Sequence, residues 1–311
     1  MRIAILGAGS IGTLIAGKIA QTNLAEVLIH CRGEHAARLA IDGIVVKGIE
    51  EFSIEPDKFH LSIQDIKFND VFDGCADYIL ISAKANDVDE MMSIARRLSK
   101  NDTKVMILSN GLGHLERSID LFGPHRVVAS TITHGAWKQE PGVIHWAGIG
   151  SFNLGGISAG PSKIDLSDLI DLLVESKLNP NWLEDGYSMI WSKVLLNIAI
   201  NPISAITGLP NGELLNREMF QTCVEVMLEG AKIARLEGIS IGRDEDLIDN
   251  LRAVIEATSE NQCSMLQDVR KGKVTEIKYL NQQVVERSEK YGLYSPLNQL
   301  LTKLIQSISS F

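Results

Sequence analysis

The sequence predicts an α/β domain built on a parallel sheet, followed by an all-helical domain. Short β-branched runs alternate with helical patterns over about the first 184 residues, which is typical of a doubly wound sheet. A glycine-rich turn joins the first of these runs to the first helical pattern. From about residue 185 the apolar residues recur with a helical period.

The length and charge of the chain limit the classes of function. Its 311 residues suggest two domains, which we place at residues 1–184 and 185–311. The 39 acidic residues outnumber the 30 Lys and Arg residues, so the formal net charge is −9. This balance argues against a general nucleic-acid or anionic-membrane binder, which would need a basic face. The sequence shows no run of about 18 apolar residues, so we expect no membrane-spanning helix.

The cysteines and histidines argue against a metal site and against disulfides. No Cys-x-x-Cys, His-x-His or His-Glu-x-x-His pattern occurs, so neither a zinc site nor a disulfide framework is expected. The apolar start Met1–Leu6 is too short for a secretory signal, and glycines follow it directly. We therefore expect a cytoplasmic protein whose thiols are reduced and buried, namely Cys31, Cys75, Cys223 and Cys263.

The first elements form a dinucleotide-binding pattern. Arg2–Leu6 reads RIAIL, which is typical of a strand buried in a parallel sheet. GAGSIG follows with the G-x-G-x-x-G spacing, then a helical pattern and a second strand at Glu26–His30. This is the context that a Rossmann-type fingerprint requires, whereas an ordinary glycine loop would not need it. The predicted cradle consists of Gly7, Ala8, Gly9, Ser10, Ile11 and Gly12.

A physical reason explains why each of the three glycines stands at its position in this cradle. Gly7 permits the tight turn, Gly9 lets the backbone approach a pyrophosphate, and Gly12 allows the helix to pack closely on the strand. The N–H groups at the start of the helix then face the anion.

The end of the second strand bears on the choice of cofactor. An NAD site usually places Asp or Glu there to bind the ribose hydroxyls. This strand instead runs into Cys31 and Arg32, and a guanidinium suits a 2′-phosphate. The sequence therefore favours NADP. Two alternatives stay open: Arg32 is only a solvated charge in a loop, or the nearby acid Glu34 reduces the preference for NADP over NAD.

Further strands and helices alternate along the rest of the first domain. We expect strands at 77–82, 104–108 and 126–132 and helices at 87–98 and 113–121. Lys84 and Asn110 each follow a strand end, at the edge where ligands of such sheets bind. Residues 134–156 carry a turn signal at Pro141-Gly142, so we expect a hairpin or an irregular antiparallel edge there.

The second domain is expected to consist of helices at 187–200, 213–237, 244–256 and 275–290 and from 296 onward. In the first of them, Lys193, Asn197 and Asn201 recur at intervals of four along one face of an otherwise apolar helix. Two amides and one lysine favour a ligand-binding face, although a narrow solvent-facing stripe gives the same spacing. Pro202 is expected to end or kink this helix.

Another polar segment reads SMLQDVRKGKVTEI, at 264–277. Ser264 and Gln267 fit a capping box at the start of a short helix. Glu276 is predicted in the first turn of the next helix, where the helix dipole favours an acid. Both residues therefore have a structural explanation beside a functional one.

Together these segments resemble the ketopantoate reductases, a family of NADPH-dependent enzymes of pantothenate synthesis. The resemblance covers nearly the whole chain, in order and in spacing. It rests on GAGSIG at 7–12, SAKAND at 82–87, SNGLG at 109–113, THGA at 133–136, WSKVLLNIAINPISAITGLPNGE at 191–213 and SMLQDVRKGKVTEI at 264–277. It implies an NADP-binding Rossmann-like domain and a helical substrate or dimerisation domain. The implied reaction reduces 2-dehydropantoate to (R)-pantoate.

The resemblance also implies roles for single residues. Lys193 matches the family's proton-donating lysine, and Glu276 matches an acid near the nicotinamide ribose and the substrate hydroxyl. Asn110 is similar to an asparagine that touches both cofactor and substrate. Substrate-binding positions match Asn197, Asn201, Asn211 and Ser264, and cofactor-side positions match Arg32, Lys84 and Ala136.

Some features leave alternatives open. Relatives often have an aromatic residue directly after the lysine that corresponds to Lys84, where this chain reads Ala-Lys-Ala-Asn. The stretch around His134 and Trp137 varies in the family. A paralogous NADP-dependent reductase of another 2-oxo acid or ketone is one alternative. A non-catalytic NADP-binding sensor is another. We expect a small 2-oxo acid as partner, neither nucleic acid nor membrane, and either a monomer or a homodimer.

Overall fold

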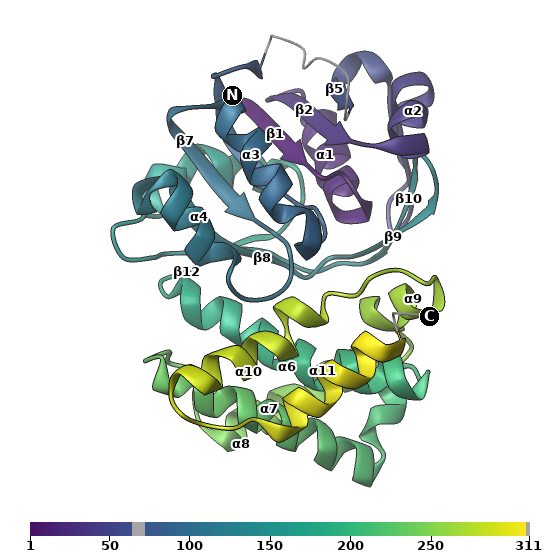
Figure 1. Ribbon diagram of the computed structural model, residues 1–311. Helices are drawn as coiled ribbons and strands as arrows, with labels where there is room; N and C mark the ends of the chain where they lie inside the picture. Colours follow the sequence, from purple (N-terminus) through teal and green to yellow (C-terminus); the bar gives the residue numbers. More distant parts are fainter. Residues whose placement is uncertain (64–71, 309–311) are drawn as a thin grey trace. The chain divides into compact units, whose positions relative to one another are not determined.

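The chain folds into two units, which we describe one at a time. The computed structural model describes residues 1–63 and 72–308 (Figure 1). Unit 1 comprises Met1–Ser109 and His114–Gly186, and unit 2 comprises Asn110–Gly113 and the chain from Tyr187 onward. The chain thus leaves unit 1 at Gly186, and the short Asn110–Gly113 segment groups with the helical unit although it lies far upstream.

Unit 1 contains the predicted sheet, which has eight strands in the order β12-β11-β8-β7-β6-β1-β2-β5. The strands are β1 (Arg2–Leu6), β2 (Glu26–Cys31), β5 (His60–Ile63), β6 (Ala76–Ile81), β7 (Ser99–Ile107), β8 (Val127–Ile132), β11 (Phe152–Gly155) and β12 (Pro180–Leu183). From β8 to β5 neighbouring strands are parallel, whereas β11 runs antiparallel to β8. The predicted fold class is therefore confirmed.

Helices cover this sheet. They are α1 (Ser10–Thr22), α2 (Gly33–Asp42), α3 (Val88–Leu98), α4 (His114–Phe122) and α5 (Ser167–Glu175), with short 3₁₀ turns η1 (Pro56–Lys58), η3 (Ala85–Asp87), η4 (Pro124–Arg126) and η5 (Ile164–Leu166). In the central strand β1, residues Ile3–Leu6 are fully buried. A strand buried on both faces explains the continuous apolar run that predicted it.

A second sheet of four strands, in the order β4-β3-β10-β9, packs against α1. It consists of β3 (Ile44–Gly48), β4 (Phe52–Ile54), β9 (Gly135–Glu140) and β10 (Val143–Gly148). The predicted hairpin at Pro141-Gly142 is the β9–β10 pair. The parallel pairing of β10 with β3 was not predicted, because these strands lie about 100 residues apart in the sequence.

A buried lysine joins α1 to this second sheet. Lys18 is only 1% exposed, and its Nζ lies 2.9 Å from Oε2 of Glu50. The same Nζ lies 5.4 Å from the centre of the Phe52 ring and 5.3 Å from that of Trp146. The carboxylate and the two ring faces together compensate for the loss of water around the ammonium group.

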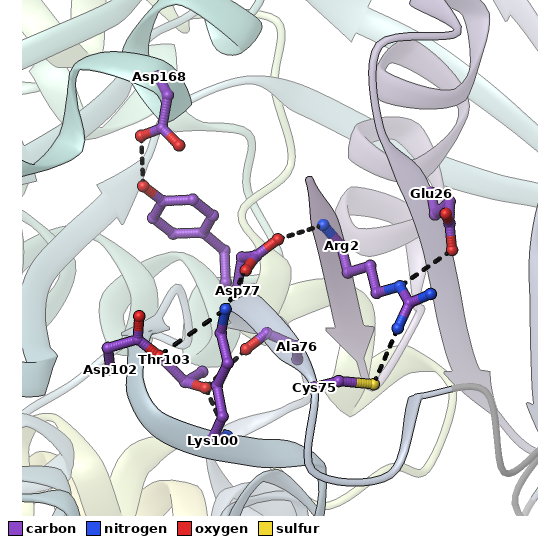
Figure 2. Close-up of polar contacts among 10 residues, drawn as sticks. Arg2, Glu26, Cys75, Ala76, Asp77, Lys100, Asp102, Thr103 and Asp168 are labelled. Carbon is purple, nitrogen blue, oxygen red and sulfur yellow. Dashed lines mark hydrogen bonds and ion pairs between the residues drawn. The ribbon is translucent and has the colours of Figure 1, made fainter.

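The amino ends of the parallel strands carry a separate polar network (Figure 2). Asp77 accepts from the backbone N–H of Arg2 at 2.7 Å and from Nζ of Lys100 at 2.5 Å, and Tyr78 donates to Asp168 at 2.5 Å. Burial raises the pKa of Asp77, but the two donors outweigh it and the net pKa is below the usual range. Asp77, Tyr78, Lys100 and Asp168 border a polar cavity of about 510 Å³. The contacts bind strand ends to each other, which is a stabilising role.

Unit 2 consists of helices (Figure 1). They are α6 (Gly186–Thr207), α7 (Arg217–Leu236), α8 (Asp244–Ala257), α9 (Ser264–Arg270), α10 (Asn281–Lys290) and α11 (Pro296–Ile308), with 3₁₀ turns η6 (Asn211–Leu215) and η7 (Ile277–Tyr279). Helix α6 is long and apolar enough to cross a membrane by length and composition alone, which we did not expect. In this structure 67% of its most apolar 18-residue window is buried inside the protein, as in a core helix.

Of the two outcomes expected at Pro202, an end or a kink of α6, the end is wrong, because the helix continues through Pro202 to Thr207. Pro202 has no N–H, so the carbonyl oxygen of Ile198, four residues earlier, loses its helical donor. Asn281, fully buried on α10, supplies the missing donor: its Nδ2 lies 3.0 Å from that oxygen. The same Nδ2 lies 3.0 Å from Oδ1 of Asn298. A side chain 83 residues away thus lets the helix continue.

Two predicted helix starts are also wrong. The N-cap of α9 is Cys263, whose Sγ accepts from the N–H of Leu266 at 3.3 Å, and Ser264 is the first helical residue. Glu276 does not begin a long helix but precedes the short turn η7, and α10 starts only at Asn281. In both places the structural explanation offered for the polar residue, a cap or a first-turn acid of a long helix, no longer holds.

Candidate active site

The turn after β1 passes very close to the backbone of the neighbouring strand ends. Gly7 has a positive φ of +79°, and a Cβ there would overlap the backbone of Ala83. The N–H groups of Gly7 and Ala8 both donate to the carbonyl of His30, at 3.0 Å. The fold itself therefore requires a glycine at residue 7.

Gly9 differs from Gly7. Its φ of −79° is open to any residue, and among the described atoms a Cβ there would have only the oxygen of Gly7, at 4.0 Å, as a neighbour. The fold therefore does not require glycine at residue 9. The helix α1 begins at the next residue, so its free N–H groups and positive dipole end border this open space. Such a cradle fits the pyrophosphate of a dinucleotide.

This contrast predicts the effect of one methyl group. Gly9→Ala should leave the melting temperature unchanged and weaken dinucleotide binding by about tenfold or more, because the methyl group fills the cradle rather than the protein core. Thermal unfolding and a fluorescence titration with NADPH measure the two effects. Gly7→Ala is the matched control and should lower the melting temperature. Unaltered NADPH affinity in Gly9→Ala would place the cofactor elsewhere.

The remaining residues predicted on the cofactor side also belong to unit 1. Arg32 directly follows β2, Lys84 follows β6 and precedes η3, and Ala136 lies on β9, a strand that packs against α1. Arg32 contacts a carboxylate that no sequence pattern assigns to the site. Its Nη2 lies 2.8 Å from Oδ2 of Asp87, at the end of η3. The only sequence signal for Asp87 was its place in the SAKAND segment.

Unit 2 brings together three of the predicted residues. Asn110 donates through Nδ2 to Oε2 of Glu276 at 3.0 Å, across 166 residues of sequence. The turn that carries Asn110 docks on η7, since the N–H of Leu112 donates to the carbonyl of Tyr279 at 2.8 Å. Gly111 makes this docking possible, because a Cβ there would overlap the same carbonyl.

Lys193, on α6, is the third member of this group. Burial lowers the pKa of Lys193 from 10.5 to about 8, and the charge of Glu276 acts in the opposite direction. An ammonium group with this pKa is still mostly protonated at neutral pH, yet gives up its proton more readily than an ordinary lysine. This is the property that a general acid needs.

The other predicted substrate residues occupy different parts of unit 2. Asn197 is half-buried and Asn201 buried, one and two turns after Lys193 on α6. Asn211 is buried in η6 and donates to Oγ1 of Thr258 at 2.9 Å, whereas its Oδ1 has no hydrogen-bond partner within the described part of the chain. A buried acceptor of this kind suits a ligand hydroxyl or N–H. Ser264 is exposed at the start of α9.

The side chains that the structure describes form neither a metal site nor a disulfide. Within residues 1–63 and 72–308, no group of three or more His, Cys, Asp or Glu side chains is arranged to hold a metal ion. The four cysteines are free thiols, and burial raises the pKa of Cys31 and of Cys223 to about 12, so both are poor nucleophiles.

Comparison with known proteins identifies one family over nearly the full length of the chain. The family model described as "Ketopantoate reductase PanE/ApbA" matches residues 3–159, and that described as "Ketopantoate reductase PanE/ApbA C terminal" matches residues 186–309. The chain is 32% identical over 311 residues to the 2-dehydropantoate 2-reductase of Pyrococcus horikoshii, covering 100% of this chain and 98% of the relative. The corresponding enzyme of Pyrococcus abyssi is 30% identical, covering 98% and 97%.

Solved structures with this fold include proteins named for two different activities. D-mandelate dehydrogenase, in a ternary complex with NADH and anilino(oxo)acetate, superposes with a TM-score of 0.88 at 26% identity, covering 100% of this chain and 99% of that one. A PanE/ApbA family ketopantoate reductase from Ralstonia eutropha gives a TM-score of 0.87 at 25% identity, with the same coverage. The two family models together match most of the sequence, and the chain therefore belongs to the ketopantoate reductase family.

Proposed function

We propose that this protein is a cytoplasmic 2-dehydropantoate 2-reductase, which catalyses NADPH + 2-dehydropantoate + H⁺ → (R)-pantoate + NADP⁺ in pantothenate and coenzyme A biosynthesis. The observation that carries the proposal is the group formed by Lys193, Glu276 and Asn110, in which the charge of a carboxylate acts on a half-buried lysine whose pKa is lowered. Membership of the family supports the reaction type.

The dinucleotide side of the proposal rests on unit 1. The open space at Gly9 and the start of α1 would hold the pyrophosphate, and Arg32 and Lys84 would contact the 2′-phosphate. Ala136 lies on a strand that packs against α1, which supports its place on the cofactor side. When bound, the reduced nicotinamide supplies the hydride.

The acid chemistry rests on Lys193. Its Nζ would donate a hydrogen bond to the 2-oxo oxygen of the substrate, stabilise the negative charge that develops there and transfer a proton to it. General-acid catalysis of this kind contributes roughly 10²–10⁴-fold, and the positive charge aimed at the oxyanion adds to it. Glu276 would keep Lys193 protonated and bind the substrate hydroxyl, and it also orients the amide of Asn110.

The remaining polar residues would bind the substrate at its ends. Asn197, Asn201, Asn211 and Ser264 are neutral groups that can bind a carboxylate and a terminal hydroxyl. Each such hydrogen bond contributes about 1 kcal/mol net, so specificity would come from their number and placement. The orphaned Oδ1 of Asn211 supports its part in this set, since it lacks a partner among the described residues.

A second candidate is a reductase of a different 2-oxo acid. The superposition on D-mandelate dehydrogenase, with its TM-score of 0.88, favours it, because that protein was solved with NADH and anilino(oxo)acetate. This candidate retains the role of Lys193 and changes only the substrate and the preferred cofactor.

The deciding measurement is the loss of NADPH absorbance with 2-dehydropantoate, run beside NADH and a panel of aliphatic and aryl 2-oxo acids. We expect 2-dehydropantoate with NADPH to give the highest kcat/KM. A higher kcat/KM with an aryl 2-oxo acid would support the second candidate. Binding of NADPH without turnover on the whole panel would instead indicate a sensor.

Gel filtration of the same sample distinguishes the monomer from the homodimer, which we propose forms through the helical unit.

Glu276→Gln tests the partner of Lys193. Loss of the carboxylate removes the charge that raises the pKa of Lys193, so the decline of kcat/KM at alkaline pH should move to lower pH. The KM for the 2-oxo acid should rise as well. A pH series of initial rates shows both effects, with the exposed Glu289→Gln on α10 as control. If the profile of Glu276→Gln matched the unaltered protein, Glu276 would have a structural role only.

A further inference from the structure

The structure pairs the residue proposed for the 2′-phosphate with a carboxylate. Nη2 of Arg32 lies 2.8 Å from Oδ2 of Asp87, although 55 residues separate them. Arg32 follows β2 and Asp87 follows β6, and β1 lies between these two strands in the sheet. The ion pair therefore bridges the two neighbours of β1 at the edge where the Gly7–Gly9 turn begins.

Neither side chain of this pair caps the helix that follows it. Asp87 precedes α3 and Arg32 precedes α2, but in the described structure neither side chain makes a capping hydrogen bond. The side chain of Arg32 is 59% exposed and that of Asp87 is 34% exposed. An ion pair so open to water contributes at most about 1 kcal/mol, so a ligand can replace it at little cost.

The pair has opposite consequences for the two nicotinamide dinucleotides. A 2′-phosphate carries a charge of about −1.5 to −2, so it must take Arg32 from Asp87 and lie beside a like charge. A ribose with a free 2′-hydroxyl can instead donate a hydrogen bond to the Asp87 carboxylate. This is the role that an acid at the end of the second strand has in NAD sites. The sequence places no acid at that strand end, but the tertiary structure brings one to it.

We propose that Asp87 is a specificity-determining residue, which weakens the preference for NADPH and allows the protein to use NADH as well. The inference rests on the proposed dinucleotide site of unit 1 and deepens it. It assigns to Arg32 two competing partners, a protein carboxylate and a ligand phosphate.

Asp87→Asn in the full-length protein tests this inference. The amide is isosteric but uncharged, so the Kd for NADPH should fall by about three- to tenfold, the size expected for one charge near a solvent-exposed phosphate. The Kd for NADH should stay the same or rise, and the gain for NADPH should shrink as salt is added. Fluorescence titrations with NADPH, NADH and 2′-AMP at two salt concentrations measure these changes.

Two further variants separate the local effect from a general change of charge. Asp89→Asn, two residues away, removes the same charge from a residue that pairs with Arg117, and should leave the NADPH:NADH affinity ratio unchanged. In Arg32→Ala, NADPH should bind more weakly. Adding Asp87→Asn to Arg32→Ala should raise the affinity for NADPH by a smaller factor than Asp87→Asn does in the unaltered protein.

The outcomes separate this inference from the proposed function. If NADPH and NADH bind the unaltered protein but Asp87→Asn leaves their affinity ratio unchanged, the specificity role of Asp87 is overturned and the reductase proposal stands. If neither dinucleotide binds the unaltered protein, both proposals are overturned.

Discussion

Replacing Lys193 with alanine is expected to lower kcat for 2-oxo acid reduction by on the order of 10²-fold or more, while NADPH still binds. The variant loses both the proton donor and the positive charge aimed at the developing oxyanion. Lys193→Met is the companion variant, because it keeps the apolar stem of the side chain within α6. Steady-state kinetics with 2-dehydropantoate and a separate NADPH titration measure the two properties. A kcat near that of the unaltered protein in both variants would rule out Lys193 as the acid.

The pH dependence gives an independent test of the same residue. Burial lowers the pKa of Lys193 to about 8, and the reduction needs the protonated form. The value of kcat/KM should therefore be level below this pKa and fall about tenfold per pH unit above it. An ordinary lysine would keep its proton to much higher pH. Lys193→Ala should lack this decline, and a decline of equal steepness in the variant would assign it to another group.

Replacing Asn281 with leucine is expected to lower the free energy of unfolding by about 2–3 kcal/mol, although Asn281 lies in no proposed site. The substitution leaves two buried oxygens, those of Ile198 and Asn298, without the donor that the structure gives them. Urea unfolding followed by circular dichroism measures the loss. Asn250→Leu, exposed on α8, is the control and should change stability by less than about 0.5 kcal/mol.

A double-mutant cycle with Pro202→Ala identifies the cause. Alanine at residue 202 restores a backbone N–H that can donate to the carbonyl of Ile198. In the Pro202→Ala variant, Asn281→Leu should therefore lower the free energy of unfolding by about 1 kcal/mol less than in the unaltered protein. The two substitutions are thus expected to be coupled. Strictly additive losses would mean that Asn281 stabilises unit 2 without compensating for the proline.

The elements recognised from the sequence are those whose signal is local. The strand β1, the glycine turn and α1 follow one another within the first 22 residues, and each has its own periodicity or turn chemistry. The helices of unit 2 were predicted for the same reason. The elements missed or misplaced, such as β3 and the end of α6, depend on partners far along the chain.

The candidate site divides in the same way. The residue types of the site can be identified from the sequence alone: glycines for a phosphate cradle, a lysine and two asparagines on one face of α6, and an arginine after β2. The surroundings of these residues follow from the folded chain. The fold brings the carboxylate of Glu276 to the amide of Asn110, and the charge of Glu276 also acts on Lys193. It partly buries Lys193, which lowers the pKa of this lysine, and it pairs Asp87 with Arg32. This division arises because periodicity and turn chemistry act over a few residues, whereas desolvation and charge pairing depend on groups that only the folded chain brings together.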